Sequence, residues 1–294
     1  MDGLPMLEEI RALGFEYAEL GHGIRLSLVD GIQKAVAGGV IKISSLHNFC
    51  PLPVGFMHAS PDCYMPSSRR EAERLLAVRH TLRTIDFAAS LGAKFVVLHL
   101  GTVSMRNYTD KLIDLYAKEK ADTPRFFRKR DKALRVRDRK REPYLEQVFR
   151  TLDVIAPRAR EAGIRLGVET RMDIEQIPDF DETAEIITRY GADAVAYWHD
   201  IGHAQIKENL GLTTHEFLLR RFKDQTAGMH LQDFAPPVYD HQPPGYGSFD
   251  FGRLAPFVTD KMVLAWEIHP EWKTEEIVDT VKHVHDKLRR PATS

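Results

Sequence analysis

The sequence has little cysteine, no long apolar run and almost no net charge, and each absence excludes a class of protein. Cys50 and Cys63 are the only cysteines and have no CxxC spacing, so we expect simple packing roles in a reducing cytoplasm. No run reaches the roughly 18 apolar residues of a membrane-spanning helix, and the N-terminus has no signal-peptide core. The 41 basic and 42 acidic residues nearly cancel. A membrane protein, a secreted protein and a purely electrostatic binder of nucleic acid are therefore not expected.

The size and composition fit one soluble globular domain, which we expect to span residues 1–294. Hydrophobic residues make up 43% of the 294 residues and charged residues 28%, so the chain can bury a substantial core. Short β-branched or aromatic runs recur, each followed by a loop and then by apolar residues at helical spacing. The predicted strands are residues 16–20, 40–46, 94–100, 164–170, 194–200, 227–232 and 262–268.

The helices predicted around these strands complete an alternating α/β pattern. They are residues 4–13, 29–37, 68–90, 144–161, 181–190, 214–222, 251–257 and 274–288. Alternation of this kind predicts a parallel sheet wrapped by helices, and eight helices favour a TIM-type (β/α)8 barrel over an open sheet. No GxGxxG follows the first strand, so nothing favours a dinucleotide fold. Because the first helix begins almost at Met1, we expect a barrel that lacks its first strand.

A long basic stretch interrupts the pattern at residues 104–143, where the barrel alternation predicts a short loop after its fourth strand. It contains 14 basic and seven acidic residues, which leaves 27 basic and 35 acidic residues in the rest of the chain. We expect a helical insertion whose charges face solvent, an acidic surface of the chain or a partner subunit. A phosphate-binding arm over the active site is the alternative.

Acids and histidines gather where the predicted strands end, which is where TIM barrels place their reactive groups. The strand-end residues are His47, His99, Glu169, Asp200 with His203, His230 with Asp233, and Glu267 with His269. A single strand-end acid usually caps a helix or pairs at the surface. Several acids and imidazoles at one mouth repel one another or compete for protons unless a cation holds them.

A metal centre would neutralise the repulsion among these acids and imidazoles. We predict one divalent metal ion, bound by Glu169, Asp200, His230 and Glu267. Mixed carboxylate and imidazole ligands suit Mn, Co, Mg or Zn, and no cysteine at a strand end favours a thiolate site.

Six segments together resemble the xylose isomerase-like TIM barrel superfamily, which joins sugar isomerases and epimerases to family 2 apurinic-site endonucleases. They are VVLHLG, LGVET, HDIGHA, MHLQDF, HQPPGYGSFDF and AWEIHP, and the resemblance covers about residues 4–288. In the epimerase branch it implies one metal held by the four residues above, with Glu169 and Glu267 also transferring protons. The implied reaction is isomerisation or epimerisation of a small sugar, sugar phosphate or related polyol through a metal-stabilised enediolate.

Other residues near the strand ends are predicted to bind the carbohydrate. We expect His47, His99, Arg171, His203, His241 and Trp266 to contact substrate, with Trp198 or Phe49 as alternatives for an apolar wall. Barrel packing is the simpler role for the aromatic residues. Phe234, Ala235, Pro236 and Pro237 stand where some ketose epimerases have an arginine after the metal-binding histidine. Arg171 either replaces that arginine or faces solvent.

Three other functions remain open at this point. A keto-sugar or cyclic-polyol lyase or dehydratase would use the same metal and the same proton abstraction. An apurinic-site endonuclease with several zinc ions would use more histidines. Its Asp-x-His pair, however, is represented only by Asp240 next to His241. Nucleic acid is also not expected as a partner, because the chain outside residues 104–143 is acidic. A barrel that binds sugar without catalysis has little use for two proton-transfer acids.

Two further expectations concern movement and assembly. Gly245 and Gly247 predict that the loop at residues 243–249 is a flexible lid that brings His241 towards substrate. The missing strand and the basic stretch both favour a homo-oligomer.

Overall fold

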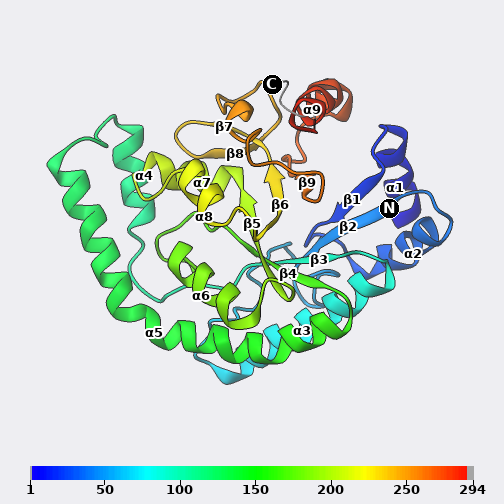
Figure 1. The fold of residues 1–294 in the computed structure, drawn as a ribbon, viewed down its shortest axis with the longest axis horizontal. Helices are drawn as coiled ribbons and strands as arrows, with labels where there is room; N and C mark the ends of the chain where they lie inside the picture. The colour runs from blue at the N-terminus through cyan, green and yellow to red at the C-terminus, as the bar shows by residue number, and fades with distance from the viewer. Residues whose placement is uncertain (1, 290–294) are drawn as a thin grey trace. The chain divides into compact units, whose positions relative to one another are not determined.

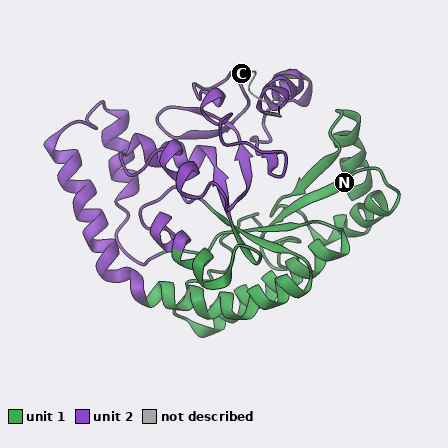
Figure 2. Cartoon of the chain, viewed as in Figure 1, with its two compact units in different colours: residues 1–102, 143–169, 185–196 green, residues 103–142, 170–184, 197–294 purple. Residues whose placement is uncertain are grey.

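A computed structural model describes residues 2–289, which form two compact units (Figure 2). Unit 1 comprises Met1–Thr102, Pro143–Glu169 and Glu185–Ala196, and unit 2 comprises Val103–Glu142, Thr170–Ala184 and Tyr197–Ser294. The single domain over residues 1–294 stays a prediction, and its ends, residue 1 and residues 290–294, lie outside the described residues.

Unit 1 is built on four parallel strands that pair in the order β1, β2, β3, β4 (Figure 1). Its strands are β1 (Tyr17–Leu20), β2 (Lys42–His47), β3 (Phe95–Leu98) and β4 (Arg165–Glu169). Its helices are α1 (Gly3–Ala12), the 3-10 turn η1 (Leu26–Leu28), α2 (Val29–Ala37) and α3 (Glu71–Ser90). The long helix α5 (Pro124–Glu161) and helix α6 (Phe180–Tyr190) each contribute their C-terminal part.

Unit 2 continues the parallel pattern with β5, β6 and β9. Strand β5 (Val195–Asp200) enters from unit 1 and pairs with β6 (Thr226–Leu231), which pairs with β9 (Val263–Trp266). The strands β7 (Asp233–Ala235) and β8 (Tyr239–Gln242) form a separate antiparallel pair. The helices are α4 (Thr109–Ala117), the first parts of α5 and α6, α7 (Ile201–Asn209), α8 (His215–Arg221), the 3-10 turn η2 (Phe251–Arg253) and α9 (Thr274–Arg289).

All seven predicted strands are confirmed, and all seven run parallel to their neighbours within each unit. Every residue of β5 is buried, as are four of the five residues of β4. Strands that are covered on both faces consist of continuous apolar runs, so they are easily recognised in the sequence. The absence of a first barrel strand stays a prediction.

The observed helices agree less completely with the predicted ones. Residues 251–257 were predicted to be a helix, but only the 3-10 turn η2 forms there. Pro256 supplies no backbone N–H and disfavours helical geometry at Ala255, so a helix cannot extend through this segment. Helix α7 and the β7–β8 pair were not predicted, whereas α4 lies within the helical insertion expected at residues 104–143. Helix α5 also continues through Pro143, where the predicted helix was expected to begin.

The basic stretch at residues 104–143 is largely helical in unit 2. Leu112, Leu115, Phe126 and Ala133 turn one side of α4 and α5 into the core of the unit. On the same side, the buried Arg137 guanidinium donates to both carboxylate oxygens of Glu182, at 2.9 and 2.6 Å, and to Asp179 at 3.0 Å. This buried ion pair therefore fixes α5 against the start of α6.

Replacing Arg137 should destabilise unit 2. In Arg137→Met, the fully buried Glu182 carboxylate loses its two bonds from Arg137 and keeps Arg141 as its remaining guanidinium partner, at 3.3 Å, which should cost about 2 kcal/mol of unfolding free energy. Urea unfolding followed by circular dichroism measures the change. Arg135→Met is the matched control, because Arg135 lies on the same helix but is exposed, and it should change stability by less than about 0.5 kcal/mol. Equal losses in both variants would show that the buried pair is not what holds α5.

Lys207 on α7 gives a second test of the same region. Burial, aided by the charge of Arg137, lowers the pKa of Lys207 to about 8 from its usual 10.5. Below pH 8 the lysine is protonated in both the folded and the unfolded chain, and the folded state bears the full burial penalty. Wild type should therefore gain stability relative to Lys207→Met as the pH rises from 8 to 10.5, with no change in this difference from pH 6 to about 8. The exposed Lys223→Met control should show no such pH dependence.

None of the helices within residues 2–289 combines the length and the apolar character needed to cross a bilayer.

Candidate metal centre

The C-terminal ends of β5, β6 and β9 bring an aspartate, a histidine and a glutamate together within unit 2. Asp200 is the last residue of β5 and pairs in register with His230 of β6, and Glu267 directly follows β9. The Nδ1 atom of His230 lies 3.6 Å from Oδ2 of Asp200 and 3.2 Å from Oε2 of Glu267. We call Asp200, His230 and Glu267 the unit 2 cluster.

The unit 2 cluster has the burial and the donor atoms of a metal site. The side chains of Asp200 and His230 are fully buried, and that of Glu267 is 28% exposed. One ligand atom from each lies within 4.8 Å of the others. Two carboxylates this close in a shielded site repel each other unless a cation or a proton neutralises them. This buried cluster can therefore hold a metal ion, with an opening to solvent on the Glu267 side.

Both oxygens of Asp200 are held in place by its neighbours. Oδ1 accepts the backbone N–H of His203 at 2.6 Å, which makes Asp200 the N-cap of α7. Oδ2 accepts a hydrogen bond of 2.8 Å from Nε2 of Gln232. The Asp-x-x-His spacing thus has a structural cause, since a cap bonds the amide three residues on. His203 is oriented in turn by Nδ1, which lies 2.9 Å from the Thr170 carbonyl oxygen.

His241 on β8 stands next to the exposed side of the cluster. Its Nε2 lies 3.7 Å from Oε2 of Glu267, and its Nδ1 lies 3.0 Å from Oδ1 of Asp240. Burial alone would lower the pKa of His241, but the hydrogen bonds that its ring donates to Asp240 and Glu267 outweigh this effect and raise the pKa to about 11. His241 is therefore cationic at neutral pH beside these two carboxylates.

The loop at residues 243–249 is held around Asp233 in this structure. The carboxylate of Asp233 accepts backbone N–H groups from Gly245, Gly247 and Phe249, at 2.9 to 3.1 Å. A Cβ atom at Gly247 would lie 2.4 Å from Asp233 Oδ1, and Gly245 has a φ of +91°. The glycines therefore allow a tight turn around Asp233, and the flexible lid that brings His241 towards substrate stays a prediction.

Unit 1 contains its own buried group around Glu169, the last residue of β4. Oε2 of Glu169 lies 3.0 Å from Nε2 of His47 and 2.9 Å from Nε2 of His99. Nδ1 of His99 is also 3.5 Å from Asp62, and the His22 ring contacts that of His47. His47 and His99 thus orient the Glu169 carboxylate. A sugar hydroxyl that formed a hydrogen bond with either Nε2 atom would have to compete with the Glu169 carboxylate for it.

The remaining predicted contact residues divide by burial. Arg171 lies in unit 2 and is 3% exposed, so the solvent-facing alternative is wrong. Trp198 is fully buried against His230, with ring centroids 5.5 Å apart, and Phe49 is buried against Tyr64. Both therefore serve packing. Trp266 is half-buried beside Phe251, which leaves part of its ring accessible.

Sequence reasoning missed the residues that support the cluster, chiefly Gln232, Asp240 and the anchoring role of Asp233. A signal for Gln232 was present, because residues two apart on a strand share a face and Gln232 follows His230 by two. Asp240 and His241 both lie on β8, and the β7–β8 pair that contains this strand was not predicted.

Comparison with known proteins identifies the family. The chain belongs to the xylose isomerase-like TIM barrel family, whose model matches residues 7–290. The predicted fold class, an α/β TIM-type barrel, is confirmed. Protein y4fM of Sinorhizobium fredii (strain NBRC 101917 / NGR234), an uncharacterised protein, is 25% identical over 240 residues, which are 81% of this chain and 66% of that protein. The chain thus spans slightly less than two thirds of that relative.

Solved structures of similar fold include sugar epimerases and a nuclease-family protein. The 3-keto-D-glucoside 4-epimerase YcjR of E. coli has a TM-score of 0.68 and 15% identity, over 97% of this chain and 94% of its own. A D-psicose 3-epimerase has a TM-score of 0.64 and 13% identity, over 97% and 93%. A family 2 AP endonuclease of Brucella melitensis has a TM-score of 0.63 and 16% identity, over 94% and 90%. Identities this low establish the shared fold alone.

Removing the hydrogen bond from Gln232 should weaken metal binding. Without it, Asp200 Oδ2 loses the donor that fixes its orientation, and lost support of this kind costs about 10- to 100-fold in metal affinity. Titration of the metal-stripped protein with Mn²⁺ or Zn²⁺ compares wild type with Gln232→Leu. Gln225→Leu, near the start of β6, is the control and should bind as wild type does. Unchanged affinity in Gln232→Leu would mean that Asp200 is not a ligand.

Proposed function

We propose that this protein is a metal-dependent enzyme that epimerises or isomerises a small sugar, sugar phosphate or related polyol. The observation that carries the proposal is the unit 2 cluster, in which a fully buried aspartate and histidine meet a glutamate that reaches solvent. Such a set combines metal ligands with a carboxylate that substrate can approach. The epimerases of similar fold support the reaction class, although their substrates differ from one another.

We assign Glu169 as the fourth ligand of this metal. Its carboxylate is 1% exposed and sits at the end of β4. The next residue, Thr170, belongs to unit 2, where its N–H donates to the carbonyl of Trp198 at 2.9 Å, two residues before Asp200. The residue that follows Glu169 is therefore hydrogen-bonded to the strand that ends in Asp200. A buried carboxylate also needs a cationic partner to remain ionised.

The donor set fits a hard or borderline divalent ion. Three carboxylates and one imidazole suit Mn, Co, Mg or Zn, and the set contains no thiolate. When bound, such an ion polarises a substrate carbonyl and its neighbouring hydroxyl, and so lowers the cost of an enediolate.

In our proposal Glu169 and Glu267 are the proton-transfer groups. One removes a proton from the carbon beside the carbonyl, and the other returns a proton to the opposite face or to the neighbouring carbon. His47 and His99 hold the Glu169 carboxylate in one orientation, and His241 contacts that of Glu267. His203, Arg171 and Trp266 would then complete the contacts with the sugar.

The alternative functions are distinguished by what happens to the bound molecule. A lyase would follow the same proton abstraction with loss of a β-hydroxyl, whereas a sugar-binding barrel would release its ligand unchanged. The endonuclease fold relative shares the architecture only. The cytoplasmic location, the carbohydrate partner and the homo-oligomer stay predictions.

The proposal is tested by exchange of substrate hydrogen with solvent. Wild type loaded with Mn²⁺ and incubated in D₂O with a panel of keto sugars should incorporate deuterium at the carbon that changes configuration or at its neighbour. Glu169→Gln and Glu267→Gln should each reduce this exchange by about 10²- to 10⁴-fold, because the amide cannot take up the proton.

Glu271→Gln is the matched control, since Glu271 is an exposed glutamate four residues after Glu267, and it should retain wild-type exchange. Deuterium-labelled product that has lost water would identify the lyase instead. Wild-type rates in Glu267→Gln, with the fold intact by circular dichroism, would contradict the assignment.

A further inference from the structure

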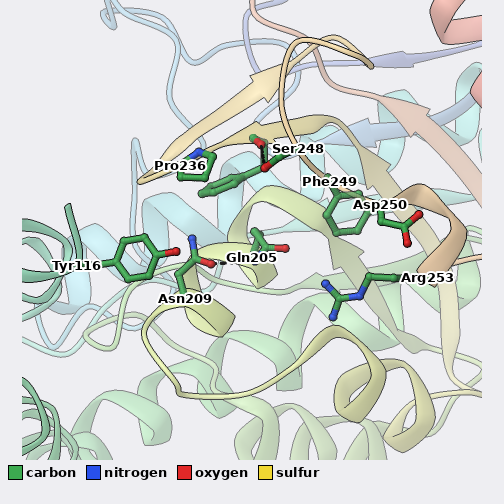
Figure 3. A pocket seen from close by; sticks show the side chains of 9 residues that line it. Tyr116, Gln205, Asn209, Pro236, Ser248, Phe249, Asp250 and Arg253 are labelled. Carbon is green, nitrogen blue, oxygen red and sulfur yellow. Dashed lines mark hydrogen bonds between the residues drawn. The ribbon is translucent and has the colours of Figure 1, made fainter. Parts of the chain in front are cut away.

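Unit 2 contains a pocket that is separate from the unit 2 cluster and has no part in the proposed reaction. It has a volume of about 270 Å³ (Figure 3). Tyr116 of α4, Gln205 and Asn209 of α7, and Ser248, Asp250 and Arg253 supply its polar lining. At about 30 Å³ for each water, the pocket has room for roughly nine waters, so it fits a small molecule and not a polymer.

The pocket lies along the second half of α7, whereas the unit 2 cluster lies at the start of this helix. Asp200 caps the N-terminus of this helix, and Asn209 is its last residue. A rise of 1.5 Å per residue puts their backbones about 13 Å apart along the helix axis. No member of the unit 2 cluster lines the pocket. A ligand here would occupy a second site.

An amide pair on α7 leaves one donor and one acceptor for a ligand. Nε2 of Gln205 donates to Oδ1 of Asn209 at 2.9 Å, which aligns the two side chains one helical turn apart. Oε1 of Gln205 then remains to accept a hydrogen bond. Nδ2 of Asn209 is buried and has no hydrogen-bond partner among the described residues. Buried donors are nearly always paired, so this N–H group is suited to an acceptor that a ligand brings.

The charges around the pocket exclude an anionic ligand. Arg253 is held by Glu216 through Nε and Nη2, at 2.7 and 2.8 Å, and by Glu208 at 2.9 Å. The hydrogen bond from Arg253 lowers the pKa of Glu216 to about 2, so that carboxylate stays ionised. Asp250 adds a third carboxylate to this single guanidinium. The surroundings are therefore net negative, which opposes a phosphate, sulfate or carboxylate.

A ligand that both accepts and donates hydrogen bonds fits the remaining polar groups of the pocket. An ammonium group cannot accept from Asn209, and a phosphate dianion cannot donate to Gln205 or Asp250. Hydroxyl groups do both. Phe249, Phe234 and the Tyr116 ring provide apolar surface for the C–H face of a ring. We propose that this pocket is a second binding site, for a small neutral polyol such as a free monosaccharide.

Saturation-transfer NMR with D-glucose tests the proposal on the intact protein. D-Glucose has the required hydroxyls but no ketone, and we expect saturable binding that persists after the metal is removed with EDTA and in Glu267→Gln. Asn209→Asp keeps the shape of the side chain and its bond from Gln205 but removes the free donor. It should weaken glucose binding about tenfold or more, with metal content unchanged. Asp250→Asn should weaken binding by a smaller factor.

Three outcomes would overturn this site. One is glucose binding that disappears with EDTA or in Glu267→Gln, which would place the sugar at the metal. Another is unchanged binding in Asn209→Asp, and the third is preferential binding of inorganic phosphate or ethanolamine. Because the readout is binding of a non-ketose, failure here leaves the exchange test of the proposed function unaffected, and failure of that test leaves this one intact.

Discussion

The carboxylate of Asp200 is the group on which the arrangement of unit 2 depends. It ends a fully buried strand, caps the helix that follows and accepts a hydrogen bond from Gln232, all within a few ångströms of His230. Burying an acid this deeply is costly unless hydrogen bonds and a cation stabilise its charge. The same constraint applies to Glu169 in unit 1, where two imidazoles converge on one oxygen. In our proposal, one metal ion would neutralise both carboxylates.

In our account, the position of these side chains at the strand ends makes them reactive groups and not only packing residues. Parallel strands end at one edge, and side chains there are free to vary because the core is built below them. Trp198 and Phe49 lie within the packed interior, whereas Glu267 keeps 28% of its side chain exposed. In our account the buried members fix the metal, and the exposed glutamate meets the substrate.

The sequence predicted the strands and the strand-end acids well because buried parallel strands produce unbroken apolar runs. It failed where local signals conflict with tertiary structure. Helix α7 starts directly after Asp200 with no intervening loop, and the sequence analysis placed no helix there. The glycines after Gln242 suggested a lid, but nothing in the local sequence pointed to the turn that they form around Asp233. The spacing of two residues from His230 indicates the face on which Gln232 lies, but its contact with Asp200 joins distant segments and has no local signature.

Anomalous diffraction from crystals grown with Mn²⁺ tests the central claim most directly, because it locates the metal without relying on activity. The account predicts one strong peak, with oxygen and nitrogen ligands at about 2.2 Å from Glu169, Asp200, His230 and Glu267. A peak elsewhere in the molecule, several peaks bound mainly by histidines, or no peak at saturating Mn²⁺ would contradict it.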